Sequence, residues 1–133
     1  MQTDKTDDYV AYRLKQAEET YEAACVLYEA HYWNSVVNRL YYACFYAASA
    51  LLIHHRVLTK SHAGVIGQFS QHFVRTGLID EDSFKVYSKL LNWRNKGDYN
   101  DLFDFSKDDV TPMLSGARRF IDSVKGLAEI KPL

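Results

Sequence analysis

The sequence predicts an all-α protein, folded as an antiparallel, up-and-down bundle of about five helices. Apolar residues recur at steps of three and four along five segments, and no segment shows the alternation of a strand. Only two prolines and six glycines interrupt the 133 residues, 47% of which are hydrophobic. Because short links join the segments, we expect neighbouring helices to pack antiparallel in one domain, residues 1–133, with its core at about residues 9–128.

The first two segments differ in how their apolar residues are spread. The second, WNSVVNRLYYACFYAASALLIHH, is apolar on almost every side, which predicts a helix buried in the middle of the bundle or shared with a second subunit. Asn34, Asn38 and Arg39 lie in its first third, and because a charge there is costly in lipid, we expect no membrane span. The first segment has the pattern of an amphipathic helix of about six turns. Its apolar stripe is Val10, Leu14, Ala17, Tyr21, Ala24 and Tyr28.

The third and fourth helices are predicted from the residues at their ends. The third runs from Ser61, a favourable N-cap, to about Arg75, and Gly77 is expected to stop it. The fourth opens at DEDS, where acidic residues suit a helix N-terminus. Gly97 is its predicted left-handed stop.

The fifth helix is predicted to begin after DFSKDD, with Ser106 as its N-cap. Pro112 would then lie past the first turn. Either the helix kinks there, or a lead-in turn precedes a start at Thr111. The basic residues of its second half are expected on the solvated face: Arg118, Arg119 and Lys125.

The charge balance and the cysteines limit the classes of function. Sixteen basic residues against 17 acidic ones leave no global field to attract nucleic acid. Cys25 and Cys44 lie in two different helical patterns without a CxxC motif, which is typical of reduced, buried cysteines in a cytosolic protein. The N-terminal stretch MQTDKTDDYV is polar and acidic, unlike a secretory signal. We therefore predict a cytoplasmic protein.

No metal site and no cofactor are predicted from the histidines. His54 and His55 are adjacent, so on a helix they point about 100° apart and cannot chelate one ion together. His62 and His72 add no HxxxH or HExxH spacing.

The stretch LLNWRNKGDYNDLFDF allows two interpretations of Arg94. The apolar stripe of the fourth helix reaches Arg94 at the next step after Phe84, Tyr87 and Leu91. In the structural interpretation, Arg94 stabilises the end of the helix and pairs with Asp98 or Asp101. In the functional one, Arg94 lies at a cleft with Asn95 beside it, and its planar guanidinium holds a phosphate.

Arg39 lies within an otherwise apolar helix and therefore needs a partner. An ion pair with Glu22 or Glu29 of the first helix is the preferred interpretation. Alternatively, Arg39 joins Arg94 in a cationic cleft.

Three stretches together resemble a HEPN domain of the small, single-domain bacterial and archaeal type. They are NSVVNRLYYACFYAASALL in the second helix, LTKSHAGVIGQFSQHFVRTGLID through the third, and RNKGDY at the end of the fourth. The resemblance covers roughly Tyr12 to Val124. It implies a helical bundle that forms a homodimer and is often encoded beside a minimal nucleotidyltransferase in toxin–antitoxin or defence loci.

The resemblance also bears on activity. Many HEPN domains are metal-independent RNases whose motif is Arg, a polar residue, and then His some four to six residues after the Arg. Arg94 and Asn95 match the first two elements, but no His follows Arg94 in the chain, and Tyr99 stands in that region. A phenol with a pKa near 10 is about 0.1% ionised at pH 7, so Tyr99 is a poor base. His62 is the candidate substitute, although first-turn capping or packing is its preferred role.

We therefore expect a HEPN-like binding or regulatory module rather than an efficient enzyme. Its expected partners are a second copy of the chain and a nucleotidyltransferase-type protein or a nucleotide, whereas the balanced charge disfavours RNA. The alternative is an RNase toxin that uses Arg94, Asn95 and a histidine from elsewhere, His62. The residues expected to bind a ligand are Arg94, Asn95, Asp98, Tyr99 and Arg39.

Overall fold

The fold is all-α, as predicted. The computed structural model describes residues 5–99 and 104–128, with the backbone alone for residues 97–99. This part of the chain contains no strand. Its elements are α1 (Thr6–Glu29), α2 (Trp33–His54), α3 (His62–Phe69), a π-helical turn η1 (Ser70–Val74), α4 (Glu81–Tyr99) and α5 (Lys107–Ala128).

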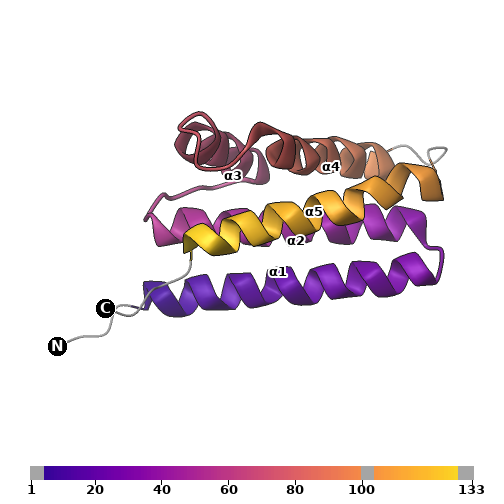
Figure 1. The fold of residues 1–133 in the computed structure, drawn as a ribbon, viewed down its shortest axis with the longest axis horizontal. Helices are drawn as coiled ribbons and strands as arrows, with labels where there is room; N and C mark the ends of the chain where they lie inside the picture. The colour runs from indigo at the N-terminus through magenta and orange to yellow at the C-terminus, as the bar shows by residue number, and fades with distance from the viewer. Residues whose placement is uncertain (1–4, 100–103, 129–133) are drawn as a thin grey trace.

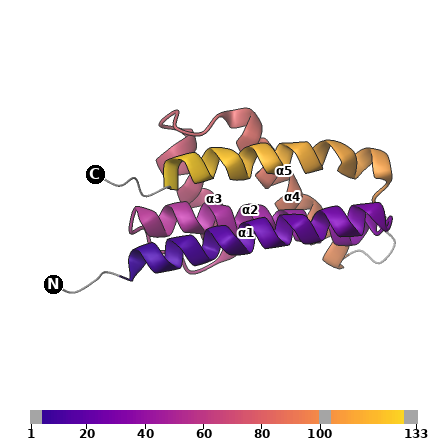
Figure 2. The ribbon, with the colours of Figure 1, turned by 60° about the horizontal axis from the view of Figure 1, so that its bottom comes forward.

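Helix α2 is the centre of the bundle. It packs against α1, α3, α4 and α5. Helix α2 lies between its antiparallel neighbour α1 on one side and α3 and α4 on the other, and α5 runs alongside it (Figure 1). The second view shows the same arrangement, with α1, α2 and α5 running side by side (Figure 2).

The burial of α2 agrees with its sequence pattern over most of the helix. Eleven of its 22 residues are buried where the helix meets its neighbours, whereas one side is half-buried or exposed and carries Asn38, Arg39, Tyr42, Phe45, Tyr46 and Ser49. By length and composition α2 could span a membrane, but 61% of its most apolar 18-residue stretch is buried inside the fold. The same test is passed by core helices of soluble proteins. The prediction of a buried core helix is therefore confirmed.

The cysteines lie at two depths in the fold. Cys25 and Cys44 are both free thiols. Cys44 is buried, as expected, whereas Cys25 is only half-buried.

Ion pairs between α1 and α5 correct one prediction. Arg118 was expected on the solvated face of α5, but it is half-buried and donates two hydrogen bonds to Glu18 of α1, at 2.6 and 2.8 Å. Lys125 donates to the same carboxylate at 3.1 Å, and Asp122 accepts from Arg118 at 2.7 Å. The guanidinium also lies 4.9 Å from the centre of the Tyr21 ring. These contacts fix how α5 lies against α1.

The Glu18 carboxylate should make the protein less stable at low pH. Hydrogen bonds from Arg118, with help from Lys125, lower the pKa of Glu18 from 4.5 to about 2. The contribution of ionised Glu18 to the free energy of unfolding is therefore present above about pH 4.5 and is lost as the pH falls from about 4.5 to about 2. Allowing for solvent screening, we expect this loss to be about 1–2 kcal/mol.

Chemical denaturation at several pH values measures this contribution. Glu18→Gln should remove the loss of stability between about pH 4.5 and 2 that Glu18 causes. Glu19 forms an exposed pair with Lys15, so Glu19→Gln should keep that loss. Equal pH profiles for the two variants would contradict the prediction.

The ends of α3 and α5 follow the predicted signals. The Ser61 side chain caps α3 by accepting a hydrogen bond from the backbone N–H of Gly64, at 2.9 Å. Gly77 adopts a left-handed conformation (φ +84°) where the third helical segment has ended. Ser106 and Asp109 form a reciprocal capping box, in which each side chain accepts from the other residue's backbone N–H. This box starts α5 at Lys107.

Three details of the helices differ from expectation. The third segment is not one α-helix, because its last part is the π-helical turn η1. Helix α4 continues through Gly97 to Tyr99, so the predicted stop at Gly97 is wrong. A glycine inside a helix costs only about 1 kcal/mol relative to alanine and does not by itself end the helix. Pro112 lies inside α5, so the alternative start at Thr111 is also wrong.

Two glycines of α5 should respond oppositely to substitution by alanine. A Cβ at Gly116 would lie 2.7 Å from a methyl group of Val86 in α4, whereas a Cβ at Gly126 would meet no atom within 4 Å. We therefore expect Gly116→Ala to lower the free energy of unfolding by about 1–3 kcal/mol. Gly126→Ala should raise it by about 0.5–1 kcal/mol, since alanine favours the helix. Urea denaturation of both variants tests this, and a stabilised Gly116→Ala would contradict it.

Candidate functional site

Arg94 lies against aromatic rings of α2. The buried positions of α4 include Tyr87 and Leu90, and Arg94 follows them on the same face, half-buried. Its guanidinium carbon is 5.1 Å from the centre of the Tyr41 ring and 5.2 Å from that of Tyr42. It also donates a hydrogen bond of 3.0 Å to the Tyr42 hydroxyl. A cation held on two ring faces keeps its charge while its orientation is fixed.

The two tyrosines reach Arg94 because α2 is the central helix. Tyr41 is fully buried, and burial raises its pKa to about 12 although the Arg94 charge acts in the opposite direction. It therefore stays a neutral phenol at any ordinary pH. Tyr42, one position along, is half-buried, so its ring lies at the edge of the core.

His62 joins the same aromatic cluster from the start of α3. Its Nδ1 lies 2.9 Å from the Tyr41 hydroxyl, and its ring centre is 4.3 Å from that of Phe45. Burial, and then the positive charge of Arg94, lower the pKa of His62, so its imidazole is neutral at pH 7. Ser61 supplies the cap of α3, and His62 packs against the rings of α2. The structure thus brings together Arg94 and His62, which are far apart in the sequence.

Arg39 approaches the cluster from outside. Its side chain is exposed, donates to the Asn38 side chain at 2.9 Å, and lies 5.9 Å from the centre of the Tyr42 ring. The predicted ion pair with Glu22 or Glu29 is wrong. Residues three apart on a helix are neighbours, so Arg39 folds along its own helix onto Tyr42 and does not cross to α1.

The remaining predicted residues lie at the end of α4. Asn95 is exposed and, one residue after Arg94, points about 100° away from it. Asp98 and Tyr99 belong to the last turn of α4, but their side chains lie outside the described residues, as does Asp101. The interpretation that pairs Arg94 with Asp98 or Asp101 therefore stays a prediction.

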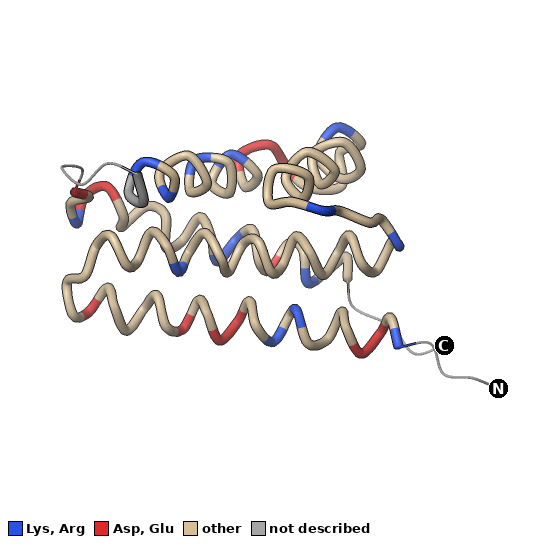
Figure 3. The backbone as a smooth tube through the Cα atoms, turned by 180° about the vertical axis from the view of Figure 1, so that it is seen from behind, with Lys and Arg blue, Asp and Glu red and all other residues tan. Residues whose placement is uncertain are grey.

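The arrangement gathers positive charge around one ring. Arg94 from α4 and Arg39 from α2 both approach Tyr42. In the backbone view, basic residues follow the acidic start of α4, and α1 carries both acidic and basic residues (Figure 3). Two guanidinium groups at a partly exposed ring suit a phosphate or another anion. No group of three or more residues able to hold a metal occurs in the part of the chain that the structure describes.

Sequence patterns did not reveal the part played by Tyr41 and Tyr42. An aromatic pair in an apolar helix is expected to pack in the core, and Tyr41 does. The available signal was the position of Arg39 three residues before Tyr42, a spacing that places the two side chains together on a helix.

Comparison with known proteins identifies the family. The model of the HEPN domain matches residues 10–127. This chain belongs to the HEPN domain family. The HEPN fold also agrees with the crystal structure of ST0689, an archaeal HEPN homologue, at a TM-score of 0.72 and 18% identity over 90% of this chain and 98% of that one.

Two relatives of this HEPN protein have closer sequences. A UPF0332 protein of Thermotoga maritima is 33% identical over 120 residues, which cover 90% of this chain and 91% of the relative. The protein named "Putative toxin MJ0605" of Methanocaldococcus jannaschii is 36% identical over 109 residues, or 82% of this chain and 81% of the relative. The relatives of this chain thus include proteins whose names read "putative toxin".

Proposed function

We propose that this protein is a HEPN-type binding and regulatory module that acts in the cytoplasm as a homodimer. Its partner is a nucleotidyltransferase-type protein in a toxin–antitoxin or defence-type system. The toxin names of its relatives support that setting. One observation carries the binding role: the guanidinium groups of Arg39 and Arg94, from two helices, approach the same Tyr42 ring.

The ligand of this site bears a phosphate, as in a nucleotide or in RNA. Arg94 is oriented by the hydrogen bond to the Tyr42 hydroxyl, and Arg39 is exposed beside it. A planar guanidinium can donate two parallel hydrogen bonds to a phosphate. Because no histidine follows Arg94, the site lacks the usual general base of the RNase motif and is proposed to bind rather than cleave.

Incubation of the purified protein with total RNA in EDTA tests this proposal. We expect the RNA to stay intact with both the native chain and Arg94→Ala. We also expect a labelled RNA oligonucleotide to bind the native chain more tightly than the variant. Cleavage by the native chain alone would contradict a purely binding role.

A second candidate function, a metal-independent RNase, is favoured by one specific observation. His62 is half-exposed, close enough to Arg94 for that charge to lower its pKa, and neutral at pH 7, which are the properties of a usable general base. If the native chain cleaves RNA, His62→Gln should lower the rate by about 10²–10⁴-fold. An unchanged rate in His62→Gln would exclude His62 as the base.

The proposed homodimer has a direct test. The chain has a mass of 15.4 kDa, so light scattering of the purified protein should give about twice this value. Large side chains exposed on α1, namely Tyr9, Tyr12 and Val26, are available for such a contact. A monomer mass at high concentration would contradict the proposal.

A further inference from the structure

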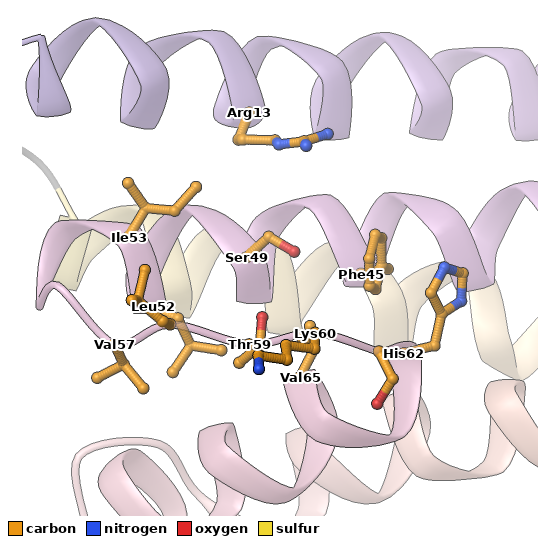
Figure 4. Close-up of a pocket in the computed structure, with 12 residues that line it drawn as sticks. Arg13, Phe45, Ser49, Leu52, Ile53, Val57, Thr59, Lys60, His62 and Val65 are labelled. Atoms are coloured by element: carbon orange, nitrogen blue, oxygen red, sulfur yellow. The ribbon is translucent and has the colours of Figure 1, made fainter.

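A second site lies on the other side of His62. There a cavity of about 340 Å³ opens between α1, α2, the connection after α2, and the start of α3 (Figure 4). Arg13 reaches it from α1, Ser49 from α2, Lys60 from the connection, and His62 from α3. Cavities of this size hold small organic ligands.

Basic residues and hydroxyl groups supply the polar part of the lining. Arg13 and Lys60 provide two cations, and no carboxylate lines the cavity within the described residues. Hydroxyl groups add further donors: Ser49, Thr59 and Ser61. Helix α3 also begins at this wall, and the N-terminus of a helix favours negative charge. The cavity is therefore built for an anion.

Arg13 brings a positive charge to this wall. Its guanidinium donates to the amide oxygen of Gln16 at 2.9 Å and lies 5.5 Å from the centre of the Tyr46 ring. Both partners are neutral, so they orient the side chain without cancelling its charge. Lys60 is exposed at the rim and can turn toward a ligand.

The rest of the lining is apolar and defines the body of the ligand. Phe45 and Leu52 of α2 and Val65 of α3 supply part of this apolar lining. The two cations and three hydroxyl groups of the lining offer more hydrogen-bond donors than the two oxygens of a carboxylate can use. A phosphate monoester has three strong acceptor oxygens and a charge near −2, so it fits this lining better. We propose that this cavity binds a small phosphate monoester, with its phosphate between Arg13 and Lys60 and its apolar body against Phe45 and Leu52.

This site goes beyond the proposed function, because Arg39, Arg94 and Tyr42 are not among the residues that line the cavity. The two sites share His62, which is among the residues that line the cavity and whose Nδ1 contacts the Tyr41 hydroxyl beneath Arg94. A phosphate in the cavity would therefore act on the Arg94 cluster through His62.

Calorimetric titration of the full chain with phenyl phosphate tests this inference. We expect saturable binding with a Kd of about 1 mM, in keeping with the size of the probe. Arg13→Gln should weaken binding by about tenfold, because it removes a charge-assisted hydrogen bond. Ser49→Phe, which fills the cavity and leaves both cations, should abolish it. Lys15→Gln, an exposed α1 lysine outside the cavity, is the matched control and should bind as the native chain does.

Several results would overturn the inference. One is the absence of saturable binding, and another is equal affinity for benzoate, which would contradict the preference for phosphate. A third is unchanged binding in Arg13→Gln together with loss of binding in Arg39→Gln, which would place the phosphate at the Arg94 cluster instead. Circular dichroism of each variant shows whether it has folded, so that loss of binding is not confused with loss of structure.

Discussion

Replacing Arg94 by alanine is expected to weaken the binding of an RNA oligonucleotide by about 10- to 100-fold. Truncation removes the guanidinium that the structure holds against the Tyr41 and Tyr42 rings. A charge-assisted hydrogen bond to a phosphate contributes about 1.5–3 kcal/mol, which corresponds to this range of affinity. Fluorescence anisotropy at fixed low salt measures the change, since salt screens such contacts strongly.

Arg94→Lys separates the charge of the side chain from its shape. Lysine keeps the positive charge but has no planar fork and stacks less well on a ring. We expect it to recover only part of the lost affinity. Full recovery with lysine would show that charge alone suffices, and an unchanged affinity in Arg94→Ala would remove Arg94 from the site. Arg75→Gln, an exposed arginine outside the cluster, is the control for net charge.

Replacing Phe120 by alanine is expected to lower the free energy of unfolding by about 3–5 kcal/mol. The Phe120 ring of α5 is fully buried, with its centre 5.3 Å from both Phe69 and Tyr87. These rings come from three different segments, so their packing joins α5 to α4 and to the third helical segment. Alanine would leave a cavity that the surrounding helices cannot easily fill.

Urea denaturation followed by circular dichroism measures the Phe120 effect. Phe120→Leu keeps most of the volume and should cost about 1–2 kcal/mol. A loss below about 1 kcal/mol in Phe120→Ala would mean that α5 packs less closely than the structure shows.

Apolar periodicity predicted the helices because each helix buries an apolar stripe, which in α2 widens to eleven of its 22 residues. The stripe of α1 is an example, since Val10, Ala17 and Ala24 are its buried residues and all belong to the predicted set. The Ser61 and Ser106 caps were also predictable, because capping depends on residues three apart. The π-helical turn at Ser70–Val74 was not, since its hydrogen bonds differ from those of an α-helix by one residue and the apolar spacing barely changes.

The partners of charged residues could not be predicted from the sequence. Arg118 lies on an amphipathic helix and looked solvated, because Glu18, its partner, is 100 residues away in the chain. Arg94 and Tyr42 are 52 residues apart, so their contact depends on how α4 crosses α2. Local patterns locate a charged residue on a helix face, but only the packing of the helices decides what that face meets.

A double-mutant cycle tests most directly the claim that Arg39 and Arg94 form one binding site. The affinity for an RNA oligonucleotide is measured for the native chain, Arg39→Gln, Arg94→Gln and the double variant. If the two guanidinium groups hold the same phosphate beside Tyr42, the second substitution should cost clearly less once the first is in place, with a coupling of about 0.5–3 kcal/mol. Strictly additive losses, or no loss in either single variant, would contradict the account.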